Sequence, residues 1–317
     1  MKKRLFAALV ICVLLCALLS GCKKDGSRLP DVSYDNAPQS AYAYEIDGEE
    51  AVVTGFSAEN TIANIPSELG GKPVTTIKSG AFKGNGILET VNLAPTVTTV
   101  ENNVFAGCTS LRSVSLPPSL TSIGDEAFYG CTNLQILNLP TALTHIGARA
   151  FSGCTGLENI AFPADALYIG ADAFAGTPWM AKQSLEFVMQ NGSLLKYNGS
   201  RDVVTVPSGI KVVSSAFSGN ETVEKVVLPD TVTHLTADAF SGCTALTSVS
   251  LGKAVTVIED AAFSGCTALT EISIPKSVKA IGKDAFVGCT ALTTVKGVKG
   301  SVAEKFATDK GLTFEAI

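Results

Sequence analysis

Apolar and polar positions recur along most of the chain with a period of 23 residues. Phenylalanine marks this period in two blocks, at Phe82, Phe105, Phe128, Phe151 and Phe174, and then at Phe217, Phe240, Phe263 and Phe286. Seven units keep the strict length; they begin at residues 85, 108, 131, 154, 220, 243 and 266. A fixed period of this length predicts a solenoid, and it overrules the two globular domains that 317 residues alone would suggest.

Within each unit the pattern predicts short strands and tight turns. In the second unit, Val114 and Leu116 alternate with polar residues, which is typical of a strand with one buried face. Pro117 ends that strand because proline has no N–H to donate. We expect Gly124 and Gly130 at turns with positive φ. One unit buries too little to fold alone, so about ten coils are expected to stack around one continuous apolar core.

The unit also carries a family resemblance. The pattern Leu111-x-x-Val114-x-Leu116 and the phrase P-x-x-V-T-x-I-G-x-x-A-F-x-G-C resemble the BspA-type class of leucine-rich repeats, found on bacterial surface proteins. The resemblance runs from about residue 44 to the end, with a loop insertion, GGKPV, in the first coil. It implies a β-rich leucine-rich-repeat solenoid, with host-surface or matrix proteins or neighbouring microbes as partners.

Residues 177–219 break the period. The sequence Asn191-Gly192 between apolar stretches predicts a β-hairpin, and members of the resembled family carry a similar insertion. This segment holds the candidate binding residues Trp179, Phe187 and Tyr197, and Trp179 is the only tryptophan of the chain. Two interpretations remain open: the hairpin recognises a ligand, or its rings pack back on the solenoid. We favour the second.

The two ends of the chain differ from the repeats. Ser301 and Glu304 have the spacing of a helical capping box, and Gly311 is expected to end that helix before a last strand. At the front, a basic start and the apolar run of residues 5–19 predict a secretory signal.

The signal ends in a sequence that resembles a bacterial lipobox. In Leu19-Ser20-Gly21-Cys22, the resemblance implies cleavage before Cys22 and lipidation of its thiol. The alternative is an ordinary signal peptide that contains Cys22. The polar stretch that follows predicts a tether, so the fold would stand off a membrane through lipid on Cys22. The expected parts are a signal peptide (1–21), a lipidated tether (22–43), repeat coils (44–176), an irregular coil with a hairpin (177–219), repeat coils (220–288) and a C-terminal cap (289–317).

Little in the sequence points to catalysis, metals or cofactors. The recurring cysteines have no C-x-x-C spacing, and each block holds three, so pairing within a block would leave one over. Asn85 and Asn220 occupy the same slot, which indicates a small side chain that bonds a turn. His145 and His234 share a variable repeat position that we expect to face solvent. Without a triad context, paired catalytic carboxylates or a phosphate-binding glycine loop, the chain is predicted not to be an enzyme.

Charge and surface pattern narrow the function further. Without the signal, 21 basic residues stand against 29 acidic ones, and this acidic balance argues against nucleic-acid binding. The outward positions of the first strand of each unit are small and polar, with little charge. The sequence therefore predicts a lipid-anchored cell-surface protein for adhesion or protein binding. The alternatives are a cell-wall or carbohydrate-binding module, for which an aromatic row would be expected and is missing, a hydrolase that uses the insertion, and a spacer without its own ligand.

Overall fold

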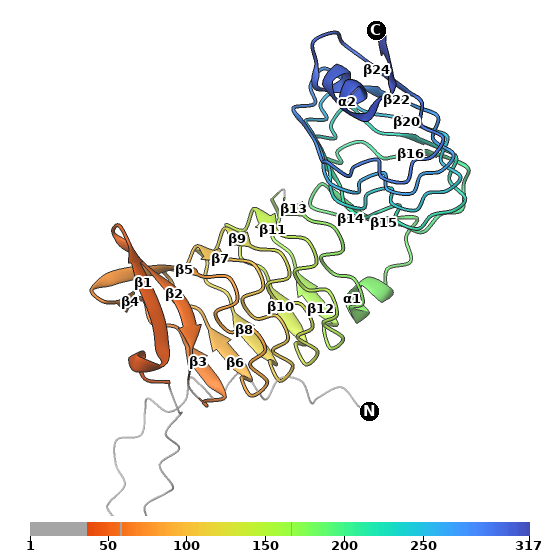
Figure 1. Cartoon of the computed structure of the whole chain (residues 1–317). Helices are drawn as coiled ribbons and strands as arrows, with labels where there is room; N and C mark the ends of the chain where they lie inside the picture. The colour runs from red at the N-terminus through yellow and green to blue at the C-terminus, as the bar shows by residue number, and fades with distance from the viewer. Residues whose placement is uncertain (1–36, 58, 166) are drawn as a thin grey trace, which may run out of the picture. The chain divides into compact units, whose positions relative to one another are not determined.

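The computed structural model describes residues 37–57, 59–165 and 167–317 as one compact unit, in which short strands stack coil upon coil (Figure 1). Each regular coil contributes two short strands to two different parallel sheets. The fold is a β-solenoid with few helices, as the period predicts.

The first strand of each coil carries the V-x-L-type pattern, and these strands pair in parallel with one another. This series consists of β3 (Ile62–Asn64), β6 (Thr90–Asn92), β8 (Ser113–Ser115), β10 (Ile136–Asn138), β12 (Asn159–Ala161), β16 (Val203–Thr205), β18 (Lys225–Val227), β20 (Ser248–Ser250), β22 (Glu271–Ile274), β24 (Thr294–Gly297) and β25 (Thr313–Ala316).

The second strand of each coil is shorter and forms a separate set of sheets. In one sheet, β5 (Lys72–Ile77), β7 (Thr99–Val100), β9 (Ser122–Ile123), β11 (His145–Ile146) and β13 (Tyr168–Ile169) follow one another. In another, β15 (Ser193–Tyr197), β17 (Val212–Val213), β19 (His234–Leu235), β21 (Val257–Ile258) and β23 (Ala280–Ile281) do the same.

The periodic phenylalanines lie in two files inside the coils. From Phe82 to Phe174, ring centroids of successive coils are 5.0 to 5.5 Å apart. From Phe217 to Phe286 the spacing is 4.9 to 5.0 Å. These separations are those of favourable stacked aromatic pairs, so each file adds ring contacts to the burial of the coil interior.

The expectation of one continuous core is wrong, because the core divides into two clusters at the irregular segment. The step from Phe174 to Phe217 is 43 residues, three fewer than two full units, so the file cannot pass through it in register. The predicted hairpin is confirmed as β14 (Phe187–Gln190) paired antiparallel with β15. Neighbouring side chains of β15 pack into different core clusters: Leu195 belongs to the first cluster and Leu194 to the second.

Both ends of the described stack are covered. At the N-terminal end, a 3-10 turn, η1 (Gln39–Ala41), leads into the antiparallel hairpin of β1 (Tyr42–Asp47) and β2 (Glu50–Phe56), which pairs with β5. The short β4 (Glu68–Leu69) pairs with β5 at the GGKPV insertion. β1 begins inside the segment expected to be tether, because Tyr42 is buried against Phe56.

At the C-terminal end, helix α2 (Val302–Lys310) lies over the last coil, and Phe306 extends the second ring file to 5.2 Å from Phe286. Gly311 ends the helix with a φ of 68° and β25 follows, as predicted. The expected capping box is wrong in detail. Glu304 accepts a hydrogen bond from the Gly300 N–H, and the buried Ser301 hydroxyl makes no cap bond.

The turn glycines have two different physical roles. Gly130 adopts a φ of 69°, as expected. Gly124 does not have positive φ; a side chain there would place Cβ 2.6 Å from the Glu101 carbonyl carbon of the preceding coil. The residue that takes positive φ in this turn is Glu126, at 54°. Gly124 is therefore required by the close approach of stacked backbones.

Candidate functional site

The first strands present a regular surface in which inward and outward residues alternate. In β10, β18 and β22, a buried residue stands between exposed neighbours: Leu137, Val226 and Ile272 point inward. This confirms the alternation expected from the sequence. We call the outward side chains of β6, β8, β10, β12, β18, β20, β22 and β24 the strand wall. They are Thr90, Asn92, Ser113, Ser115, Ile136, Asn138, Asn159, Ala161, Lys225, Val227, Ser248, Ser250, Glu271, Ser273, Thr294 and Lys296.

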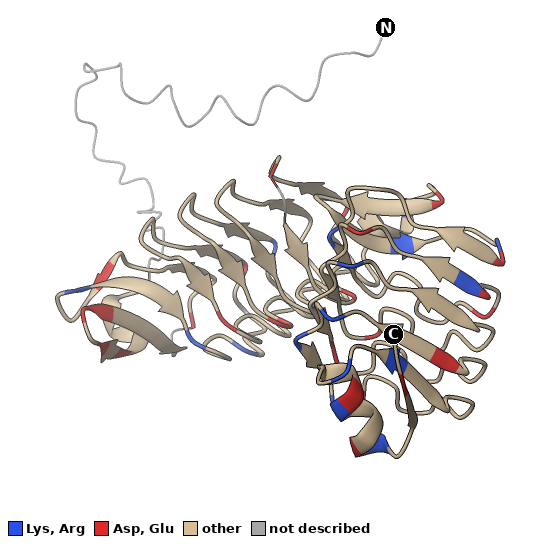
Figure 2. Ribbon diagram, turned by 90° about the horizontal axis from the view of Figure 1, so that it is seen from above, with Lys and Arg blue, Asp and Glu red and all other residues tan. Residues whose placement is uncertain are grey.

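The character of the strand wall changes along the chain (Figure 2). Strands β6, β8, β10 and β12 contain no charged residue. Strands β18, β22 and β24 contain Lys225, Glu271 and Lys296, and the Lys296 ammonium lies 2.8 Å from the Glu271 carboxylate. A surface of small polar side chains with isolated apolar ones, such as the 57 % exposed Ile136, suits shape-based contact with another protein.

The cysteines are structural, because each thiol hydrogen-bonds to the backbone of the preceding coil. Cys131 Sγ donates to the Phe105 carbonyl oxygen at 3.2 Å, 26 residues earlier in the chain. The same bond recurs at Cys108, Cys154, Cys243, Cys266 and Cys289 at 3.0 to 3.2 Å. All six thiols are free within the part of the chain that the structure describes. The repeated cysteine thus ties neighbouring coils together.

Asparagine takes the cysteine slot only where the preceding coil is irregular. Asn85 Oδ1 accepts hydrogen bonds from the N–H groups of Ile87 and Leu88, within its own turn. Asn220 does the same for the next residues of its turn. These two residues begin the first regular coil of each block, after the inserted coil and after the 177–219 segment. The amide closes the turn locally.

The candidate binding residues of the irregular segment are packed against the ends of the ring files. Trp179 is the second residue of the short helix α1 (Pro178–Ala181). It is half-buried, with its ring 5.2 Å from the Phe162 ring and 5.4 Å from the Phe174 ring. Tyr197 is buried 5.2 Å from Phe217, and the half-buried Phe187 lies 5.2 Å from Tyr197. Cys22 lies outside the described residues.

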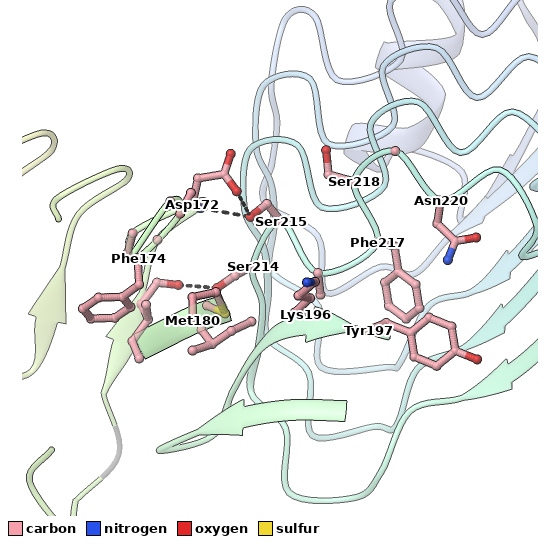
Figure 3. A pocket seen from close by; sticks show the side chains of 18 residues that line it. Asp172, Phe174, Met180, Lys196, Tyr197, Ser214, Ser215, Phe217, Ser218 and Asn220 are labelled. Atoms are coloured by element: carbon pink, nitrogen blue, oxygen red, sulfur yellow. Dashed lines mark hydrogen bonds between the residues drawn. The ribbon is translucent and has the colours of Figure 1, made fainter. Parts of the chain in front are cut away.

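A cavity of about 490 Å³ opens where the two ring files stop (Figure 3). Phe174 lines it from the first block, Met180 lines it from the irregular segment, and Phe217 lines it from the second block. Asp172, Lys196 and other polar groups complete the lining. No histidine lines this cavity, so its serines have no neighbouring imidazole base to activate them.

Serine hydroxyls join the two blocks at this cavity. Ser214 Oγ, which is buried, donates to the Ile169 carbonyl oxygen, and Ser215 Oγ donates to Asp172 Oδ1 at 2.5 Å (Figure 3). The buried Ser193 hydroxyl donates to the Leu167 carbonyl oxygen at 3.0 Å. The sequence held a signal for this joint that pattern analysis missed: Ser214 directly follows the second strand, in the slot that glycine occupies in four of the seven regular units.

A second hollow of about 560 Å³ lies on the face of the second strands. The ring of His145 stacks on Tyr168 at 4.6 Å, and the Tyr168 hydroxyl donates to Glu259 Oε1 at 2.8 Å. His234 meets the edge of Tyr168 at 6.0 Å. The expectation that both histidines face solvent therefore holds only in part: both are half-buried, and burial lowers the pKa of His145.

Within residues 37–57, 59–165 and 167–317, no group of three or more His, Cys, Asp or Glu is placed to hold a metal ion. Of the helices in the same described part, none is long and apolar enough to cross a membrane.

The fold and the repeat pattern agree with comparisons to known proteins. The model of the BspA type leucine rich repeat region matches residues 75–189 and 197–304, in six copies. Because these spans cover well over half of the chain, the protein belongs to the BspA-type leucine-rich repeat family.

Several solved structures are similar to the chain. A leucine rich repeat protein of T. pallidum, TpLRR, shares 22 % identity, with 88 % of this chain and 98 % of that chain covered and a TM-score of 0.39. A leucine rich cell surface protein of Faecalibacterium prausnitzii A2-165 shares 22 % identity, with 84 % and 95 % covered and a TM-score of 0.36. The pneumococcal vaccine antigen PcpA shares 20 % identity, with 81 % and 79 % covered and a TM-score of 0.38. A search of curated proteins found no match.

Proposed function

We propose that this protein is a non-catalytic, lipid-anchored binding protein of the bacterial cell surface, and that it holds other proteins against its strand wall. The observation that carries the proposal is the strand wall itself. Its strands offer outward side chains in register over successive coils, and their inward side chains are buried in the core. Such a face can make many small contacts with one extended partner, as repeat proteins generally do.

Membership of the BspA-type family supports a binding role that rests on the repeats. The expected partners are surface or matrix proteins of a host or of neighbouring cells. The anchor would be lipid on Cys22, held to the first coil by the polar residues that follow it.

Carbohydrate or cell-wall binding is the weaker alternative. Sugar rings pack on exposed aromatic side chains, and the strand wall contains no aromatic residue among its members. A hydrolase built on the irregular segment is also weakly supported, since Trp179 and Tyr197 pack against the ring files and the cavity beside them has no histidine.

Two experiments test the proposal. The mature chain, immobilised through its C-terminus, should capture defined proteins from surface extracts of host or microbial cells. If no protein is captured from any of these extracts, the result would favour a spacer that has no ligand of its own. In cells, radiolabelled palmitate should be incorporated into the wild-type protein and not into Cys22→Ala; label retained in the variant would end the lipoprotein proposal.

A further inference from the structure

The hollow on the second-strand face is lined by three kinds of residue: an apolar floor, an aromatic side and an acidic rim. Its apolar floor consists of the half-buried Val257 and Ile281, whereas Ile258 of the lining is buried in the core. One side is the stacked pair of His145 and Tyr168. This face lies on other strands than the strand wall, so the hollow is a separate surface.

The rim of the hollow is acidic. The carboxylates of Asp125, Glu259 and Asp260 line it, and no lysine or arginine lines it among the described residues. None of these three acids forms an ion pair within that part of the chain. By contrast, Glu271 on the strand wall has the ammonium of Lys296 at 2.8 Å.

The backbone holds these carboxylates in place. Asp125 Oδ1 accepts from the Ala148 N–H at 2.7 Å, and Glu259 Oε2 accepts from the Ala237 N–H at 2.9 Å. Glu259 stands in the slot that is Gly124 in another unit, as Glu101 does, so both side chains emerge where four of the seven regular units have glycine. An ionised carboxylate can accept several hydrogen bonds, so these acids retain acceptor capacity toward a ligand.

A smaller hollow of about 280 Å³ adjoins the first and shares Asp125 and His145 with it. Glu101 adds a fourth carboxylate there, and again no lysine or arginine lines the hollow in the described part of the chain. Because the two hollows share Asp125 and His145, they adjoin one another, and we call them together the groove.

We propose that this groove binds an arginine-containing extended segment of a partner protein, with one arginine side chain in the larger hollow. The arginine stem packs on the apolar floor, and the planar guanidinium lies beside the aromatic pair and donates to the carboxylates of the rim. Arginine fits better than lysine, because its fixed fork of donors matches carboxylates and its plane stacks on rings. The inference deepens the proposed protein-binding function by naming a second surface and the chemistry that it recognises.

The test uses labelled pentapeptides of sequence Gly-Arg-Gly-Arg-Gly, and the same peptide with lysine or glutamate in place of arginine. Binding to the mature chain is followed by fluorescence anisotropy at low salt. The groove variant is Asp125→Asn with Asp260→Asn. It should keep the fold, because Asn102 already uses an amide oxygen to accept from the Asp125 N–H in the equivalent position. The matched control is Asp202→Asn with Asp230→Asn, which removes the same charge from exposed positions outside the groove.

The arginine peptide should bind saturably, about tenfold more weakly to the groove variant and within twofold of wild type to the control. The lysine peptide should bind more weakly than the arginine peptide, and the glutamate peptide should not bind. No saturable binding, equal losses in both variants, or equal affinity for lysine would overturn the proposal. Because the groove variant leaves the strand wall unchanged, failure here with continued capture of partners would leave the proposed function standing.

Discussion

The Tyr168 hydroxyl donates a hydrogen bond of 2.8 Å to the Glu259 carboxylate, joining residues 91 positions apart in the chain. Tyr168 belongs to the last regular unit before the break in the solenoid, and Glu259 follows β21 in the second regular unit after the break. The bond therefore links the two blocks where the ring files and the core are interrupted.

Removing this hydroxyl should loosen the link. Tyr168→Phe keeps the ring against His145 but leaves Glu259 Oε1 without its donor, so we expect a loss of about 1–2 kcal/mol in the free energy of unfolding. Urea unfolding followed by circular dichroism measures it. Tyr129→Phe is the control, since Tyr129 is exposed and its ring, not its hydroxyl, meets Arg149 at 4.8 Å. Equal effects of the two substitutions would contradict the link.

Two glycines of neighbouring repeat units should respond differently to alanine. At Gly147, a Cβ would lie 2.5 Å from the Asp125 amide nitrogen of the preceding coil, so Gly147→Ala must push two coils apart. We expect a cost of about 3 kcal/mol. At Gly130 the space is open and only the φ of 69° is strained, so Gly130→Ala should cost about 1 kcal/mol. Thermal and urea unfolding of both variants checks the order, and the reverse order would contradict the stacking argument.

Acid should weaken the fold through His145. Burial lowers its pKa in the folded chain, against the opposing pull of the Asp125 and Glu259 carboxylates. The unfolded chain therefore takes up a proton near the ordinary pKa of 6.5 that the folded chain resists, and stability falls as the pH drops through that region. The Tyr168 ring stacks on the His145 ring, and the His234 ring makes an edge contact with Tyr168. Between pH 7.5 and 5.5 the urea midpoint should fall more for wild type than for His145→Gln; parallel falls would contradict the assignment.

Of the six cysteines that hydrogen-bond to the preceding coil, which we call the cysteine ladder, only Cys289 should react with a thiol reagent in the native state. Burial raises the pKa of Cys108 to about 11, and the pKa values of Cys131 and Cys266 are also raised. Cys289 is half-buried, and the neighbouring Cys266 thiol lowers its pKa. In the mature chain carrying Cys22→Ala, a disulfide reagent at pH 8 should label one thiol in the native state and six after unfolding.

The control for this labelling is Cys289→Ser, which should show no fast-reacting thiol. Rapid labelling of any other cysteine in the native chain would contradict the ladder, because a thiol hydrogen-bonded inside the coil interior is protonated and inaccessible.

The repeat made the architecture predictable, because a strict period places like residues above one another. The strand alternation, the phenylalanine files, the hairpin at Asn191-Gly192 and the structural role of the cysteines all follow from that local pattern. The period shows where it fails, at residues 177–219, but it could not reveal the path of the chain there. The split core and the serine joint depend on a segment three residues short of two units, whose path is set by tertiary packing.

The N-terminal hairpin and the second-strand groove escaped the sequence for related reasons. Tyr42 lies in a polar stretch that looks like tether, and only its burial against Phe56 identifies it as the start of the fold. Glu259 and Tyr168 are far apart in the chain, and nothing in either repeat signals that they meet. The candidate residues Trp179, Phe187 and Tyr197 were recognisable as unusual, but their aromatic partners were not.

The central claim is that the strand wall binds partner proteins. The direct measurement compares capture of a partner by two double variants. Ser115→Arg with Ser250→Arg places bulky charges on the exposed first strands, and Ile87→Arg with Val287→Arg places the same charges on exposed turns. The first pair should reduce the partner's affinity at least tenfold, while the second should leave it within twofold of wild type. Equal affinity for both variants would contradict it.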